Sequence, residues 1–255
     1  MTTADQRRTT LDRLRPYIER AEAFEGWSFP QIRTRLLEPG PPWDYEVIVR
    51  ECARKAKSAV DLGTGGGEFV AHLRDALPSR MVATEEWHVN APVARARLMP
   101  LGVDVVWCRS LQLPFAEESF DLVMNRHEEL SPSDVARVLA SGGCVVTQQV
   151  GNDNWQELRR FFPRMTDFGD IRAEYTAEFE EAGLTVRRNE RHDYRVAYEG
   201  LGDFVFMLLV TPWTIPDFNV DRDLDALLEL EDECSTADGL VLTWSRFLLV
   251  AEKPA

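Results

Sequence analysis

The sequence has few of the features that mark secreted, membrane-spanning or metal-scaffolded proteins. Its four cysteines, Cys52, Cys108, Cys144 and Cys234, lie far apart and form no C-x-x-C pair, which argues against a zinc site or a disulfide framework and favours reduced thiols. The longest apolar run, FVFMLLV at 204–210, has seven residues, far fewer than the roughly 20 that a membrane helix needs. The polar start, MTTADQRRTT, does not resemble a targeting signal. We therefore expect a cytoplasmic protein.

Basic residues are also scarce. The chain has 29 Lys and Arg against 43 Asp and Glu, which gives a net charge of −14. Nucleic acids and anionic membranes need a positive protein face, so neither is expected as a partner. The 255 residues are 44% hydrophobic, which is enough to bury a sizeable core.

Strand and helix patterns alternate through the middle of the chain. Short apolar runs predict strands at 58–63, 81–84, 103–108, 120–125 and 144–150. Helices are expected between them at 67–77, 90–99 and 132–140. Such alternation predicts an α/β fold with a mostly parallel sheet that is covered by helices on both faces.

Two segments lie outside this alternation. The segment 1–43 has a helical pattern and ends in the proline-rich bend PGPPWD, so we interpret it as an N-terminal helical arm or cap on a domain spanning 44–255. A helical insertion at about 200–238 separates two late strands, at 185–198 and 240–252, which should pair antiparallel at one edge of the sheet. Both extra segments are rich in Trp, Phe and Pro, and we expect them to form a lid.

The strongest functional signal is the glycine-rich segment AVDLGTGGGEFV at 59–70. A buried strand ends in Asp61, and glycines follow at 63, 65, 66 and 67 before a helix begins. Glycine lets the backbone approach a ligand closely, and ligands of open α/β sheets bind at the carboxyl ends of strands. The spacing D-x-G-x-G-x-G differs from the dinucleotide pattern, and no Walker lysine follows. A ligand-binding loop is predicted, and the alternative is a tight turn that needs glycine.

Two acids, Glu85 and Glu86, follow the second strand. A carboxylate at the tip of this strand suits the two hydroxyls of a ribose, and the neighbouring Trp87 could stack on an adenine. The alternatives are a solvated acidic pair and an ordinary half-buried tryptophan.

In this order and spacing, DLGTGGGEF, TEEW, LPFAEESFDLV and RVLASGGCVVTQQVG resemble the class I S-adenosylmethionine-dependent methyltransferases, and more closely the methyltransferase type 11 group. The resemblance covers about residues 55–151. It implies a Rossmann-like seven-stranded sheet with an antiparallel last strand, and S-adenosyl-L-methionine as cofactor. The cofactor-binding residues that we expect are Asp61, Gly63, Thr64, Gly65, Glu85, Glu86, Trp87, Ser110, Leu111 and Asn125.

One position departs from the family pattern. About five residues before the proline of L-P-F, such families usually have an acidic residue that contacts the adenine amino group, and this chain has Arg109 there. The contact is then expected from Ser110, from backbone groups near Leu111, or from another side chain.

Residues at the ends of the later strands are candidates for the chemistry. His127 could act as a general base, since its unperturbed pKa lies near neutrality, and Arg126 could hold a substrate carboxylate. Gln148 at the end of the fifth strand, with Trp27 and Trp213 in the lid segments, could line a substrate pocket. Each of these side chains has packing within its own segment as its alternative role.

The sequence therefore predicts a methyltransferase that acts on an O or N atom of a small molecule, as a monomer or homodimer. An RNA or protein methyltransferase is one alternative, although the acidity argues against RNA. A non-catalytic S-adenosylmethionine-binding interaction protein is the other. The histidines are scattered through the chain, so no metal is expected.

Overall fold

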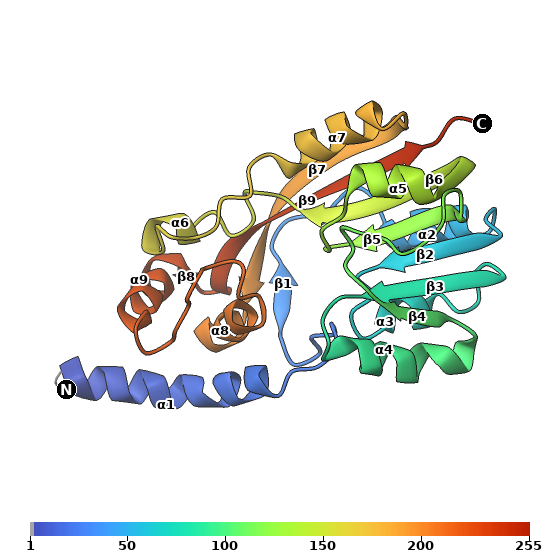
Figure 1. Ribbon diagram of the computed structural model, residues 1–255. Helices are drawn as coiled ribbons and strands as arrows, with labels where there is room; N and C mark the ends of the chain where they lie inside the picture. Colours follow the sequence, from blue (N-terminus) through green and yellow to red (C-terminus); the bar gives the residue numbers. More distant parts are fainter. Residues whose placement is uncertain (1–2) are drawn as a thin grey trace.

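One twisted sheet organises the chain, as the alternating pattern predicts (Figure 1). The computed structural model describes residues 3–255. The strands are β1 (Thr34–Leu36), β2 (Ser58–Leu62), β3 (Arg80–Glu85), β4 (Asp104–Trp107), β5 (Phe120–Arg126), β6 (Leu139–Val150), β7 (Thr185–Tyr198), β8 (Ser235–Thr236) and β9 (Gly239–Glu252).

The strand order confirms the predicted Rossmann-like sheet. The strands follow the order β1-β7-β9-β6-β5-β2-β3-β4, and β8 pairs with β9. From β6 to β4 every pairing is parallel, whereas β9 runs antiparallel to both β6 and β7. The two late strands therefore pair antiparallel, as expected, but β9 lies inside the sheet between β6 and β7, and the short strand β1, which was not predicted, forms the edge.

Helices cover both faces of the sheet. Within the described residues they are α1 (Thr3–Glu22), α2 (Tyr45–Ala53), α3 (Glu68–His72), α4 (Asn90–Leu98), α5 (Pro132–Val138), α6 (Leu158–Phe161), α7 (Ile171–Glu181), α8 (Leu201–Val210) and α9 (Leu224–Cys234), with a 3-10 turn, η1 (Met99–Leu101). One core lies between the sheet and α2, α3 and α4, and a second lies between the sheet and α5 and α7. Successive apolar residues of each central strand point to opposite faces of the sheet, so each strand contributes side chains to both cores. Such strands are typical of a sheet that is buried on both faces.

The chain near Gly142 differs from the prediction. The helix expected over 132–140 already ends at Val138, and β6 begins at Leu139. The tail of β9 accounts for this difference, because Gly142 donates its amide to the Lys253 carbonyl at 3.0 Å and Lys253 donates to the Gly143 carbonyl at 2.9 Å. These pairings continue the sheet past the point where the sequence signals a helix end.

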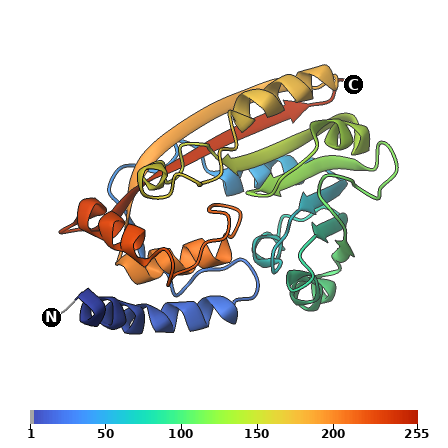
Figure 2. The ribbon, with the colours of Figure 1, turned by 60° about the vertical axis from the view of Figure 1, so that its left-hand side comes forward.

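A third core joins the N-terminal arm to the late insertion. It contains residues of α1, α6, α8 and α9 together with the far ends of β7 and β9. Figure 2 shows α1 running beside α8. Gly202 permits this close packing, since a Cβ at that position would lie 2.2 Å from the Tyr17 ring. In the described part of the chain, no helix combines the length and the apolar character needed to cross a membrane.

Candidate functional site

The glycine loop connects β2 to α3 at the carboxyl edge of the sheet. Gly63, Gly65 and Gly67 all have positive φ angles, of 67°, 62° and 79°, a conformation that glycine adopts without steric cost. The loop is also crowded, because a Cβ on Gly65 would lie 2.6 Å from the Cβ of Trp27. The glycines are therefore required both by the backbone conformation and by a close approach of other groups.

Glu85 links this loop to the tip of β3. Its carboxylate is buried and accepts the Gly65 amide at 2.7 Å and the Trp87 amide at 2.8 Å. Burial raises the pKa of Glu85 above its usual value, and the two amides act in the opposite direction. A ribose that uses this carboxylate would therefore meet an acceptor whose orientation is already fixed.

Two buried hydroxyls beside the loop form no hydrogen bond of good geometry. Thr64 Oγ1 lies near the Asp61 carboxyl and Ser110 Oγ lies near the Glu128 carboxyl, and each hydroxyl lowers the pKa of its neighbouring acid. Buried polar groups without a well-aligned hydrogen bond are rare in folded proteins and often mark the place of a ligand or water. Together with Glu85 and the glycines they form a donor and acceptor set that fits the polar parts of S-adenosylmethionine.

Acidic side chains surround the loop. Burial raises the pKa of Asp61 to about 7, and the nearby Glu85 adds to this shift. Burial and repulsion by Glu85 and Glu86 also raise the pKa of Glu128 to about 7. Glu128 contacts the loop directly, since a Cβ on Gly63 would lie 2.3 Å from its Cγ. The structure places Glu128 against the glycine loop, where a cation would relieve the crowding of negative charge.

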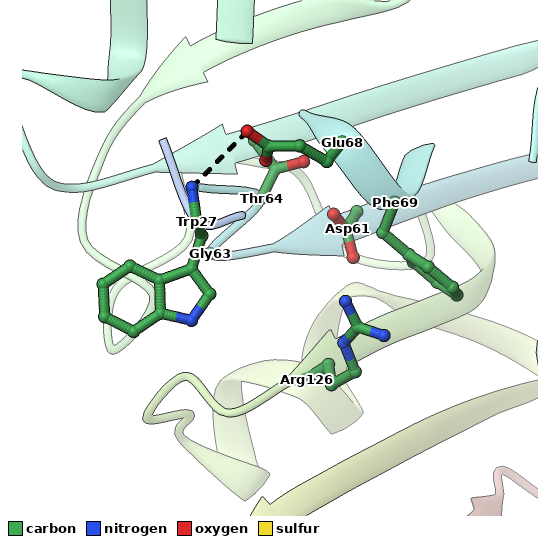
Figure 3. Close-up of a pocket in the computed structure, with 7 residues that line it drawn as sticks. All are labelled: Trp27, Asp61, Gly63, Thr64, Glu68, Phe69 and Arg126. Carbon is green, nitrogen blue, oxygen red and sulfur yellow. Dashed lines mark hydrogen bonds between the residues drawn. The ribbon is translucent and has the colours of Figure 1, made fainter. Parts of the chain in front are cut away.

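The space over the loop is small in this conformation. A cavity of about 40 Å³ is lined by Trp27, Asp61, Gly63, Thr64, Glu68, Phe69 and Arg126 (Figure 3). Pockets for small molecules usually measure about 300–1,000 Å³. The Gly26 amide donates to Asn90 at 2.8 Å and the Trp27 amide to Glu68 at 3.4 Å, so the arm is held against the loop. A cofactor can enter only if this part of the arm or Glu128 moves.

The expected adenine side is more open. Trp87 and Leu111 are 40% and 38% exposed. Glu86 is ion-paired with Arg109 at 3.3 Å, so its carboxylate faces the guanidinium that replaces the family's acidic residue. Ser110 has a buried hydroxyl that lies near Glu128 and forms no hydrogen bond of good geometry.

Asn125 lies within a buried polar network. Its Oδ1 accepts from Thr147 Oγ1 at 2.7 Å and from Gln149 Nε2, and its backbone amide donates to the Tyr45 hydroxyl at 3.1 Å. The side-chain oxygen and the backbone amide of Asn125 are therefore already hydrogen-bonded to other residues of the protein. A cofactor contact from Asn125 remains a prediction.

The chemistry candidates form a separate group next to the loop. The Arg126 guanidinium lies 4.5 Å from the centre of the Phe69 ring and points toward Asp61 in Figure 3. His127 has a left-handed backbone, with φ of 63°, and its ring Nε2 lies 3.4 Å from Gln148 Nε2. Burial, with the charges of Arg246 and Arg126, holds the pKa of His127 well below its usual value, so its ring is neutral at physiological pH.

Trp43 determines the tautomer of this neutral histidine ring through Gln148. Its indole donates to Gln148 Oε1 at 2.8 Å, and an indole N–H can only donate. The amide nitrogen of Gln148 therefore faces His127 Nε2, which must accept, and the proton of the neutral ring lies on Nδ1. Among the described residues, no three His, Cys, Asp or Glu side chains gather as a metal site, and the absence of a metal requirement remains a prediction.

Aromatic side chains join the two lid candidates. The ring of Trp27 stacks on that of Trp213, with centroids 6.0 Å apart, and also contacts Phe24 and Phe29. The arm and the insertion therefore meet at the glycine loop, although Trp213 remains 53% exposed.

Sequence reasoning does not identify several residues of this site. Glu68, Phe69 and Glu128 lie within it, and Arg246 approaches it from β9. Glu128 is adjacent to His127 in the sequence, which offers a local signal. Arg246 has none, because it reaches the site only through the pairing of β9 with β6.

Comparisons with known proteins agree with this architecture. Residues 60–147 match the profile of the family described as "Methyltransferase domain". Among curated proteins, none matches the chain in sequence. The predicted resemblance to class I S-adenosylmethionine-dependent methyltransferases is thereby confirmed for this part of the chain.

Solved structures share the fold at low sequence identity. A provisionally assigned methyltransferase from Bacillus halodurans has a TM-score of 0.60 and 18% identity, over 83% of this chain and 99% of that chain. A protein of unknown function from Deinococcus radiodurans has a TM-score of 0.60 and 16% identity, over 96% and 99%. The (4+2)-cyclase SpnF has a TM-score of 0.56 and 15% identity, over 97% and 94%. Likeness at such identities establishes the fold alone.

Proposed function

Because residues 60–147 belong to the methyltransferase domain family, we propose that this chain transfers a methyl group from S-adenosylmethionine to an O or N atom of a small-molecule acceptor. One observation carries the proposal. At the carboxyl edge of the sheet, the loop of left-handed glycines, the Glu85 carboxylate and two buried hydroxyls that form no well-aligned hydrogen bond lie together. The acidity of the chain supports a small acceptor over RNA.

The residues of the loop would bind and orient the donor. Glu85 would accept from the ribose, while the backbone of the glycine loop and Asp61 would hold the methionine part. When bound, S-adenosylmethionine supplies an electrophilic methyl group on a sulfonium. Burial and the neighbouring acids raise the pKa values of Asp61 and Glu128, and a bound sulfonium cation would favour the ionised form of both carboxyls.

The residues beyond the loop would serve the acceptor. Transfer forms an O–C or N–C bond as the C–S bond breaks, so the protein contributes mainly proximity and orientation. A protonated nucleophile must also lose its proton, and neutral His127 has the free electron pair for this on Nε2. That electron pair faces Gln148 here, so an acceptor hydroxyl would take the place of the Gln148 amide.

The arm over 1–43 and the insertion at about 200–238 would act as a lid on the domain. Their aromatic contact, Trp27 on Trp213, lies over the glycine loop. An opening of this contact would admit the donor, and its closing would exclude water and position the acceptor. Deletion of residues 1–25 should therefore reduce turnover more than it reduces donor affinity.

Calorimetry and product detection together test the proposal. S-adenosylmethionine and S-adenosylhomocysteine should bind with low-micromolar Kd values, or about −8 kcal/mol. Release of S-adenosylhomocysteine in the presence of small-molecule acceptors should then establish turnover. Absence of binding for both ligands contradicts the proposal. Binding with no turnover favours a non-catalytic protein or, as in the cyclase that shares this fold, a different reaction.

A further inference from the structure

Arg246, on the inner strand β9, has no acidic partner among the described residues. Within residues 3–255, no carboxylate lies within ion-pair distance of its guanidinium, although most arginines of this acidic chain have such a partner. The side chain is partly buried, and burial lowers the pKa of Arg246 below its usual value. A desolvated charge without a counter-ion costs free energy, so an incoming anion would be stabilised here.

The free edge of this guanidinium has the geometry that takes a carboxylate. Nη1 uses its two protons on Asn154 Oδ1 at 2.7 Å and on the Ser245 carbonyl at 2.8 Å. Nε and Nη2 donate no hydrogen bond to the described residues, and the side chain as a whole is only partly buried. These two N–H groups point in the same direction and form the side of the fork that binds a carboxylate through both oxygens.

Neighbouring side chains hold the guanidinium of Arg246 in place. Its Cζ lies over the Trp244 ring, 4.6 Å from the ring centre. The Trp244 indole donates to the Tyr198 hydroxyl at 3.1 Å, and Asn154 is buried. An arginine held in this way loses little conformational entropy when it binds a ligand, which is the advantage of a pre-organised site.

The position of Arg246 places this site beside the donor loop. In β6, Gln148 pairs with Arg126 of β5, and Val150 pairs with Arg246 of β9. Arg246 therefore lies at the carboxyl edge of β6, the edge that also carries the glycine loop. Two strand spacings across the sheet and an offset of two residues along it separate the backbone of Arg126 from that of Arg246 by about 12 Å. His127 lies close enough to both that their charges lower its pKa.

We propose that Arg246 forms an anion subsite and that the methyl acceptor is an organic carboxylate, held by the Nε and Nη2 edge of this arginine. The identification of the bound carboxylate as the methyl acceptor rests on the proposed function, whereas the anion subsite itself rests on the geometry of Arg246. A carboxylate fits better than a phosphate, because the neutral His127 leaves a single guanidinium edge with two donors. The surrounding rings of Trp244 and Tyr194 would contact the apolar body of the same molecule.

Binding of an aromatic acid and of its neutral amide tests the subsite. Benzoate and benzamide are titrated into the intact protein, with and without S-adenosylhomocysteine, and the indole N–H signals of tryptophan are followed by NMR. Benzoate should bind at least tenfold more tightly than benzamide. Equal binding of the two probes overturns the proposal, and so does displacement of benzoate by inorganic phosphate at a lower concentration than by acetate.

Variants assign the effect to the side chain. Arg246→Gln should remove the preference for benzoate, Arg246→Lys should keep part of it, and Arg187→Gln, which removes an exposed arginine paired with Glu252, should keep all of it. A preference that survives in Arg246→Gln overturns the proposal. Calorimetry with S-adenosylhomocysteine separates the two claims. If the protein binds benzoate through Arg246 but does not bind S-adenosylhomocysteine, the anion subsite is supported and the proposed methyltransferase function is contradicted.

Discussion

The carboxyl edge of the sheet has an acidic half and a basic half. Asp61, Glu85 and Glu128 surround the glycine loop over β2 and β3, whereas Arg126 ends β5 and Arg246 lies in the middle of β9, opposite the end of β6. The first half suits a cationic donor, and the second suits an anionic acceptor. The contrast indicates that one sheet edge can hold two reactants of opposite charge next to each other, with the neutral His127 at their boundary.

The largest effect should come from filling the glycine loop. Gly65→Val adds a side chain where φ is positive and where a Cβ lies 2.6 Å from Trp27. Binding of S-adenosylhomocysteine should weaken by more than about 100-fold, or roughly 2.7 kcal/mol. Calorimetry measures this loss, and circular dichroism shows whether the fold persists.

Gly102→Val is the matched control for this variant. Gly102 also has a positive φ, of 77°, but nothing lies within 4 Å of its added Cβ. It should carry the backbone strain without the loss of binding. If both variants lose affinity alike, backbone strain rather than the approach of a ligand explains the effect, and the acidic half is not a donor site.

Removal of the carboxylate at the tip of β3 should have the next largest effect. Glu85→Ala loses the acceptor that binds the Gly65 and Trp87 amides and that should bind the ribose. Affinity for S-adenosylhomocysteine should fall by about 1–3 kcal/mol. Glu86→Ala removes the neighbouring exposed acid, which pairs with Arg109, and should have a smaller effect in the same titration. The reverse order would move the ribose contact to Glu86.

The raised pKa values of Asp61 and Glu128 make donor binding depend on pH. Both carboxyls titrate near pH 7 in the free protein, so at pH 5.5 they are mostly protonated and uncharged. A cationic ligand favours the ionised forms, lowers these pKa values and releases protons. Affinity for S-adenosylmethionine should therefore rise by about tenfold per group between pH 5.5 and 7. Calorimetry near pH 6.5 in two buffers of different ionisation enthalpy should detect proton release, and proton uptake would contradict the assignment.

The two halves also differ in how far the sequence predicts them. The acidic half depends on one strand, one loop and the next strand tip, so Asp61, Gly65 and Glu85 can be recognised from their local pattern. The basic half is assembled from distant segments, since Arg246 reaches the site only when β9 inserts beside β6. Trp43 reaches Gln148 over 105 positions of sequence. Long-range pairing leaves no local signal in the sequence. For this reason the sequence predicts neither the position of β9 between β6 and β7 nor the edge strand β1.

The smallest effect on donor affinity should come from the aromatic contact of the lid. Trp213→Ala removes the ring that stacks on Trp27, and because Trp213 is 53% exposed its loss should leave the cores intact. The arm is then held against the loop mainly by the Gly26–Asn90 and Trp27–Glu68 hydrogen bonds, which are worth about 1 kcal/mol each. Hydrogen exchange of the Gly26 and Trp27 amides should accelerate severalfold, while affinity for S-adenosylhomocysteine should change by less than about threefold, or roughly 0.7 kcal/mol. Trp107→Ala, which removes a tryptophan that is 68% exposed on β4, should leave the exchange of both amides unchanged. If Trp213→Ala also leaves it unchanged, the arm is fixed packing, and the donor must enter by displacing Glu128 alone.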